Sequence, residues 1–239
     1  GDMVTFEISR DVTEGLKRIA SETGATMYMV LLAAYTTLLS KYTGQEDIVV
    51  GTPIAGRPHA DLDNLIGMFV GTLALRNYPA ADKSFMEFLY DIKEGTLKAL
   101  ENQDYPFEDL VEKLDVQKDL SRNPLFDTMF VMQNTDHVEI RLSGSELALY
   151  SREHVSAKFD LTLNATETER ELAFNLQYRT SLFRKDTMER MAAHFTCLLK
   201  AVAEQPEQRI GEICILPEQE RQLVLHGFNA AEADYPQAK

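Results

Sequence analysis

The pattern of hydrophobic and polar positions divides the chain into helical and extended segments. Apolar residues recur at helical spacing over residues 11–23, with Asp11 as the expected N-cap and Gly24 as the stop. Residues 26–42 are apolar almost all round and end before Gly44, so we expect this helix to lie in the centre of the core. No element is predicted before Asp11, and the opening three residues are interpreted as a cloning remnant.

The same periodicities predict further helices and strands. One helix is expected to follow Ser84, which forms a capping box with Glu87, one begins at Pro106, and the last covers 185–203. Apolar runs or alternation predict strands at 48–50, 69–78 and 125–133, and an antiparallel hairpin of 159–163 with 172–178. Because strands alternate with amphipathic helices, we expect an α/β protein.

Composition and charge narrow the function classes. The 239 residues carry a net charge of −14, which argues against a nucleic-acid partner because phosphate binding needs clustered Lys and Arg. The longest apolar run, within 27–39, is too short to span a bilayer, and no signal peptide is recognised, so no membrane partner is expected. Two cysteines without a C-x-x-C pair fit a cytoplasmic setting.

Candidate chemistry within the chain is sparse. The loop Gly51 to Pro58 has the glycine spacing of a phosphate-binding loop, but Arg57-Pro58 stands where that motif needs Lys and Ser or Thr, so a tight structural turn is favoured. His59 with Asp61 and Asp63 is interpreted as a solvated turn, and no metal site is predicted. His194 is expected to pack or to lie at the surface. The residue types and their spacing alone indicate no self-contained catalytic centre.

Four sequence segments nevertheless resemble the later core motifs of nonribosomal peptide synthetase condensation domains, in the family's order and at similar spacing. They are residues 42–57 (YTGQEDIVVGTPIAGR), 66–76 (IGMFVGTLALR), 102–108 (NQDYPFE) and 119–126 (DLSRNPLF). The family consists of two lobes that each resemble chloramphenicol acetyltransferase, with a substrate channel between them. The resemblance therefore implies such a lobe, a mixed sheet flanked by amphipathic helices.

The family's catalytic signature, His-His-x-x-x-Asp-Gly, belongs to the N-terminal lobe, and no two histidines are adjacent here. The resemblance thus implies that residues 1–204 are the C-terminal lobe and that 205–239 are an extension and linker toward an adenylation domain. The parent domain would be an acyltransferase that forms a peptide bond between carrier-bound thioesters, and the lone lobe is expected to be inactive. No catalytic residue is assigned within this chain.

The resemblance also assigns roles to particular residues. Arg57 is implied to pair with the signature aspartate across the lobe interface, although an exposed loop arginine is a serious alternative. Asn123 and Pro124 are placed at the same interface, where core packing is the rival interpretation. The segment lining the substrate tunnel is implied to be Met68, Phe69, Val70, Gly71 and Thr72. At Gly71 the family more commonly has Asn, which puts a polar contact from that position in doubt.

The implied partners are the N-terminal lobe, the upstream and downstream carrier domains with their phosphopantetheine arms, and the adenylation domain. No cofactor is expected to be bound by this lobe itself. Two alternatives remain open: a fragment of an epimerisation or cyclisation domain, and a non-catalytic module that docks carrier proteins. A His-His-x-x-x-Asp-Gly motif upstream would favour the enzyme.

Overall fold

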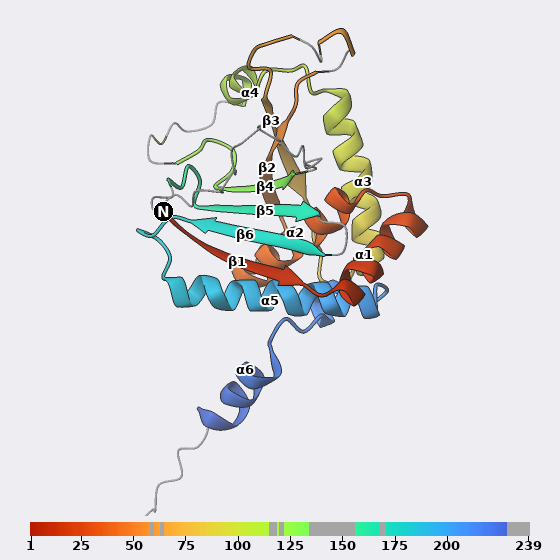
Figure 1. Ribbon diagram of the computed structural model, residues 1–239, viewed down its shortest axis with the longest axis vertical. Coiled ribbons are helices and arrows are strands. Elements are labelled where there is room, and N and C mark those ends of the chain that lie inside the picture. The colour runs from red at the N-terminus through yellow and green to blue at the C-terminus, as the bar shows by residue number, and fades with distance from the viewer. Residues whose placement is uncertain are drawn as a thin grey trace, which may run out of the picture.

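A six-stranded mixed sheet forms the centre of the molecule, with the strand order β1-β6-β5-β4-β2-β3 (Figure 1). The computed structural model describes residues 1–57, 60–62, 65–114, 119, 122–133, 156–167 and 171–228. Strand β4 runs parallel to both β5 and β2, and the other neighbours are antiparallel. The strands are β1 (Asp2–Ile8), β2 (Ile48–Ile54), β3 (Gly71–Asn77), β4 (Thr128–Gln133), β5 (Leu161–Glu167) and β6 (Leu172–Tyr178).

The structure contradicts the sequence-based prediction for the N-terminus. The residues interpreted as a cloning remnant begin β1, which pairs along its whole length with β6 from Asp2–Tyr178 to Ile8–Leu172. Phe6 stacks on Phe174 at a centroid distance of 5.1 Å. A strand at this edge depends on a partner about 170 residues away in the chain, which local patterning does not reveal.

The expected helices are present, with their ends one to a few residues from the predicted positions. The prediction of Asp11 as the first N-cap is wrong, because Ser9 precedes the helix and Asp11 lies in its first turn. Thr26 caps α2 through its side chain, and Gly24 and Gly44 end α1 and α2 at φ values of 62° and 68°. Ser84 and Glu87 form the predicted capping box of α3. The helices are α1 (Arg10–Thr23), α2 (Met27–Thr43), α3 (Phe85–Glu101), α4 (Phe107–Lys113) and α5 (Lys185–Glu204).

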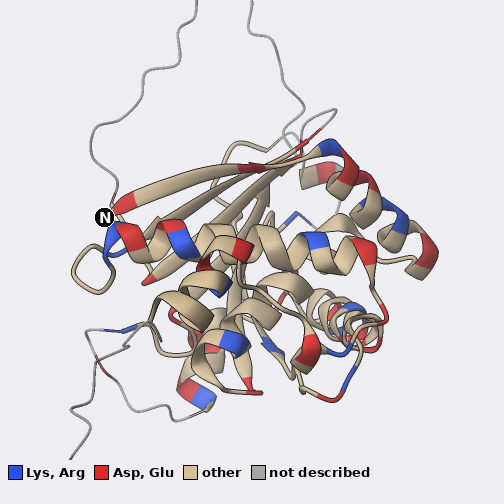
Figure 2. Ribbon diagram, turned by 90° about the horizontal axis from the view of Figure 1, so that it is seen from below, with Lys and Arg blue, Asp and Glu red and all other residues tan. Residues whose placement is uncertain are grey.

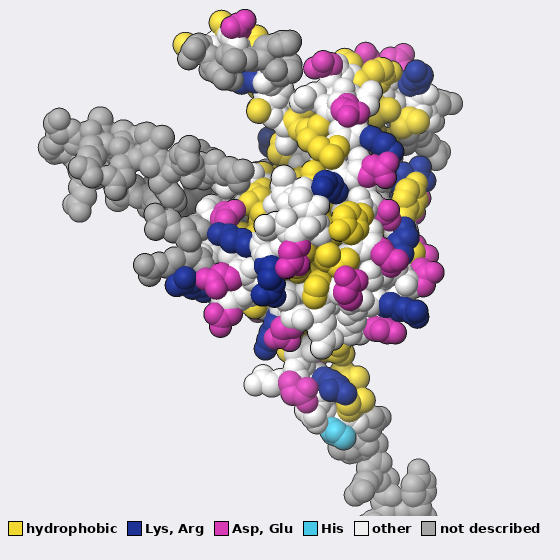
Figure 3. All heavy atoms as spheres, turned by 90° about the vertical axis from the view of Figure 1, so that its right-hand side faces the viewer, with side chains coloured by type: hydrophobic (Ala, Val, Ile, Leu, Met, Phe, Trp, Pro, Cys, Tyr) yellow, Lys and Arg dark blue, Asp and Glu magenta, His cyan; other side chains and the backbone are white. Residues whose placement is uncertain are grey.

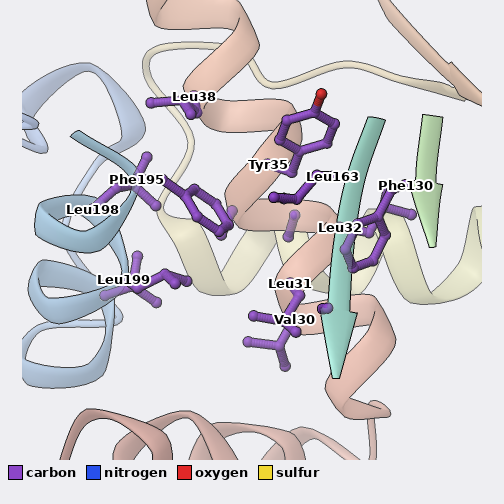
Figure 4. Close-up of a cluster of buried hydrophobic side chains, with 14 of the residues drawn as sticks. Val30, Leu31, Leu32, Tyr35, Leu38, Phe130, Leu163, Phe195, Leu198 and Leu199 are labelled. Atoms are coloured by element: carbon purple, nitrogen blue, oxygen red, sulfur yellow. The ribbon is translucent and has the colours of Figure 1, made fainter. Parts of the chain in front are cut away.

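Helices α1, α2, α3 and α5 pack on one face of the sheet (Figure 2). Residues 29–40 of α2 are all buried, as its apolar composition predicted. Figure 4 shows Tyr35 of α2 between Phe130 of β4 and Phe195 of α5. The Tyr35 hydroxyl lies 2.5 Å from Oγ1 of Thr128, which ties this helix to the sheet. Each large apolar side chain buried here contributes about 1.5–3 kcal/mol.

The segment at 51–58 differs from its prediction as a tight turn, because β2 continues through Ile54 before the chain bends. Two features explain the extension. Residues 51–54 pair with residues 71–74 of β3, and β2 touches β4 at the single pair Gly51–Met129. The predicted strand at 69–78 is correspondingly shorter and begins at Gly71.

The C-terminal part contributes to the same core before it leaves the lobe. Ile210 in the 3-10 turn η2 (Ile210–Glu212) and Ile213 are both buried. The short helix α6 (Glu218–Gln222) and the π-helical turn η3 (Leu223–Gly227) then project from the body (Figure 1). The boundary after residue 204 stays a prediction.

Within the described residues no single helix is long and apolar enough to cross a membrane, and only α1 and α2 together, bent by 110°, have the required length and composition.

Candidate functional site

The loop between β2 and β3 carries half of the residues assigned to a site from the sequence, and Arg57 holds this loop together. The Arg57 guanidinium donates hydrogen bonds to the carbonyl oxygens of Leu62 and Leu65, the second at 2.9 Å. Its central carbon also lies 4.3 Å from the centre of the Phe69 ring, within cation–π range. Arg57 therefore fixes the loop of its own lobe.

The backbone at Gly56 explains why the loop can close so tightly. Gly56 has a φ of 62°, and a Cβ built there would lie 1.8 Å from the carbonyl oxygen of Phe69. Only glycine tolerates both this conformation and this approach. Gly71 lies close by, where a Cβ would meet the Ile54 side chain at 3.2 Å. The tight turn at Gly56 thus allows Arg57 and Phe69 to lie together.

Two of the five residues assigned to the tunnel, Met68 and Val70, are exposed apolar side chains. Met68 is 93% exposed and Val70 is 60% exposed, while Phe69 is half-buried under Arg57. Leu65 and Ile66, which precede them, are exposed as well. Gly71 and Thr72 already belong to β3 and pair with Ile54 and Pro53. Contiguous apolar residues held at the surface are typical of an interaction site.

Asn123 and Pro124, the other residues assigned to the lobe interface, lie in the segment that leads into β4, and both are half-buried. An ion pair between Arg122 and Asp127 brackets this segment. Phe126 is buried and its ring contacts Phe107 and Phe159. Among the described residues, no hydrogen bond or ring contact joins Arg57 to Asn123 or Pro124, so the two assigned interface groups are separate.

Other candidate chemistry gains no support within the described part of the chain. No group of three or more His, Cys, Asp or Glu side chains there could hold a metal ion. His59 and Asp63 of the predicted solvated turn lie outside the described residues. Cys197 is half-buried, burial raises the pKa of its thiol, and Cys214 is exposed. The raised pKa disfavours the thiolate form of Cys197, which is the reactive form of the side chain.

One cluster of polar residues escaped the sequence analysis. His194, expected only to pack or to lie at the surface, is 7% exposed and contacts Tyr42 and Glu220 through its two ring nitrogens. These partners are 152 and 26 residues away in the chain, so no local motif could have revealed the cluster.

The mixed sheet, with helices on one face and an apolar loop held beyond its β2–β3 end, is the architecture of a chloramphenicol-acetyltransferase-like lobe. The chain belongs to the condensation-domain family, because the family model described as "Condensation domain" matches residues 1–225. The family and fold expected from the sequence motifs are thereby confirmed.

Curated relatives agree with this assignment. The chain is 52% identical over 236 residues to gramicidin S synthase 2 of Brevibacillus brevis, covering 98% of this chain and 5% of that protein. It is 53% identical over 236 residues to tyrocidine synthase 3 of Brevibacillus parabrevis, covering 99% of this chain and 4% of that protein. The chain therefore spans only a small part of the length of these relatives.

Solved structures show the same fold. A four-domain nonribosomal peptide synthetase determined with AMP and glycine has a TM-score of 0.84 and 26% identity, over 92% of this chain and 18% of that one. The first condensation domain of the calcium-dependent antibiotic synthetase, bound to a substrate analogue, has a TM-score of 0.75 and 22% identity. That match covers 90% of this chain and 47% of that chain.

Proposed function

We propose that this chain is the C-terminal lobe of a condensation domain that forms peptide bonds between carrier-bound thioesters, and that it works only with an N-terminal lobe. The observation that carries the proposal is the apolar segment at 65–70, which Arg57 holds at the surface beyond the sheet. A segment of this kind needs a covering partner, and the match to about half of a solved condensation domain supports a second lobe in that role.

In this proposal the lobe supplies one wall of a tunnel. Two carrier proteins present their phosphopantetheine thioesters from opposite ends, and the acceptor amine attacks the donor carbonyl carbon. A C–N bond forms, the C–S bond breaks, and the donor thiol leaves with the proton. Positioning of two tethered reactants can supply up to about 7–11 kcal/mol of the barrier, which suits a lobe without acid–base residues of its own.

Recombining the two lobes tests the proposal. The 239-residue chain, a separately produced lobe bearing the His-His-x-x-x-Asp-Gly motif, and both together are incubated with loaded donor and acceptor carriers. Mass spectrometry of the acceptor carrier should show peptide product only when both lobes are present. Turnover by the chain alone above a boiled control contradicts the two-lobe function, and an isomerised donor without a new peptide bond favours the epimerisation alternative.

Carrier binding gives a second measurement. We expect the chain alone to bind either carrier with a Kd no tighter than micromolar, about −8 kcal/mol, because the carriers also rest on the other lobe. Calorimetry with each holo-carrier measures this directly. Nanomolar binding supports the docking-module alternative instead.

A further inference from the structure

His194 on α5 connects two parts of the chain through both nitrogens of its ring. Its Nδ1 lies 2.7 Å from the hydroxyl oxygen of Tyr42 on α2. Its Nε2 lies 2.6 Å from Oε2 of Glu220 on α6. The imidazole is nearly buried, whereas the Tyr42 side chain beside it is 42% exposed.

The chemistry of the partners sets the direction of each hydrogen bond. A carboxylate only accepts, so the Nε2–H of His194 donates to Glu220. In the neutral ring Nδ1 then accepts from the Tyr42 hydroxyl, which fixes one tautomer. Burial, reinforced by the charge of Glu220, raises the pKa of Tyr42 to about 12, so this hydroxyl remains protonated and available at neutral pH.

The segment that carries Glu220 is otherwise exposed. Among the described residues of 218–228, Glu220 is the one that is not exposed. The apolar side chains that follow remain open to solvent, so their burial does not fix the direction of the segment. Figure 3 shows this segment projecting from the body with hydrophobic side chains on its surface. The exposed fractions are 51% for Leu223, 43% for Val224, 47% for Leu225 and 71% for Phe228.

We propose that Tyr42, His194 and Glu220 form a joint that fixes the direction in which the C-terminal segment leaves the lobe. A cavity of about 350 Å³ beside the joint, lined by Lys41, Arg190 and Ile215 as well as the three joint residues, admits water to one side of it. The joint can therefore open without exposing the core around α2. A domain attached after this segment would take its orientation from the joint; that consequence rests on the proposed function, whereas the joint itself does not.

Nuclear magnetic resonance on the 239-residue chain tests the joint. Long-range 1H–15N spectra should show His194 as the Nε2–H tautomer in the parent protein. Glu220→Ala removes the acceptor for the Nε2–H of His194 and should produce a mixture of tautomers with the fold intact, whereas Tyr42→Phe should keep the Nε2–H form because Glu220 only accepts. Backbone order parameters for residues 221–228 should be about 0.85 in the parent and fall below about 0.6 in Glu220→Ala.

Glu218→Ala provides the matched control. It removes a carboxylate from the same helix, and the side chain of Glu218 contacts its neighbours Arg221 and Gln222. The order parameters of 221–228 should stay near those of the parent in this variant. Equal rigidity in Glu220→Ala and the parent, a parent segment that is already flexible, or an unchanged His194 tautomer in Glu220→Ala would each overturn the proposal.

Discussion

The guanidinium carbon of Arg57 lies 4.3 Å from the centre of the Phe69 ring, across a loop that begins at a glycine with positive φ. This pair holds the apolar segment 65–70 in place while Arg57 also donates to the carbonyls of Leu62 and Leu65. A guanidinium has five N–H donors, so these bonds leave capacity for the proposed contact with an aspartate of the other lobe.

A double-mutant cycle on Arg57 and Phe69 measures this contact. In the 239-residue chain we expect Arg57→Ala and Phe69→Ala to be coupled by about 0.5–2 kcal/mol, the range of a cation–π contact. Urea unfolding of the two single variants and the double variant gives the coupling energy. Additive effects would mean that the ring contact contributes nothing to stability.

The same variant separates the two roles of Arg57. If Arg57 also pairs with a buried aspartate of the N-terminal lobe, Arg57→Ala should cost about 3 kcal/mol or more in the recombined two-lobe protein. The cost in the 239-residue chain should be smaller. Thermal melting of both forms measures the difference, and equal destabilisation would show that Arg57 serves its own lobe alone.

Replacement of Gly51 is predicted to lower the stability of the chain because of the neighbouring Phe126 ring. A Cβ at Gly51 would lie 2.1 Å from Cε2 of the buried Phe126 ring, at the one point where β2 pairs with β4. Gly51→Ala should therefore destabilise the chain by about 1–3 kcal/mol. Adding Phe126→Leu, which vacates the ring's space, should recover part of the loss relative to the sum of the two single changes.

Gly95 supplies the control for this prediction. It lies on the exposed surface of α3, and a Cβ there meets nothing within 4 Å. Gly95→Ala should stabilise the chain by about 0.5–1 kcal/mol, because alanine has the higher helix propensity. Urea unfolding measures both variants, and a tolerated Gly51→Ala would show that β2 and β4 separate easily.

These examples show which parts of the fold the sequence could predict. The capping residue Ser84 acts through the backbone amide three residues away, so its signal is local and was recognised correctly. The inward alternation of Val4, Phe6 and Ile8 was present in the sequence, but the strand that it makes depends on β6, which is about 170 residues away along the chain. Helical periodicity is local, whereas an edge strand needs its partner.

In the candidate site, too, some features could be predicted from the sequence and others could not. The motif resemblance identified Arg57 and the segment 68–72, but not that Arg57 bonds to its own loop, because Leu62 and Leu65 offer only backbone carbonyls. Any residue type could have provided those acceptors. The His194 cluster was missed because three helices bring its members together. The spacing of these residues along the chain does not predict such a contact.

Tyr28 should make the protein sensitive to alkaline pH. Burial raises the pKa of Tyr28 to about 12, and its hydroxyl has no hydrogen bond of good geometry among the described residues, although Thr52 lies near it. In the unfolded chain a tyrosine ionises near pH 10. Between about pH 10 and 12 the native state therefore binds more protons, and the free energy of unfolding should fall by about 2–3 kcal/mol from this group.

Tyr28→Phe tests that origin. At pH 7 the variant should be as stable as the parent or slightly more stable, since it removes a buried hydroxyl without a good partner. From pH 9 to pH 11.5 its stability should fall less steeply. Urea unfolding across this range decides the point, and identical slopes for the two proteins would assign the alkaline loss to other groups.

Gly71 is the position where this chain departs from the residue its family more commonly has. A side chain there would meet only the flexible end of Ile54, at 3.2 Å, so Gly71→Asn should be accommodated with a small loss of stability. If Gly71 lines the proposed tunnel, the added side chain takes up room beside the acceptor. In the recombined two-lobe protein we expect kcat/KM for a bulky acceptor to fall about tenfold relative to a small one, the scale of a methylene-sized misfit. Gly71→Ala separates the effect of the Cβ from that of the amide and should shift the ratio less. Competition assays with mixed acceptor thioesters measure both variants, and an unchanged ratio in Gly71→Asn would place this residue outside the acceptor path.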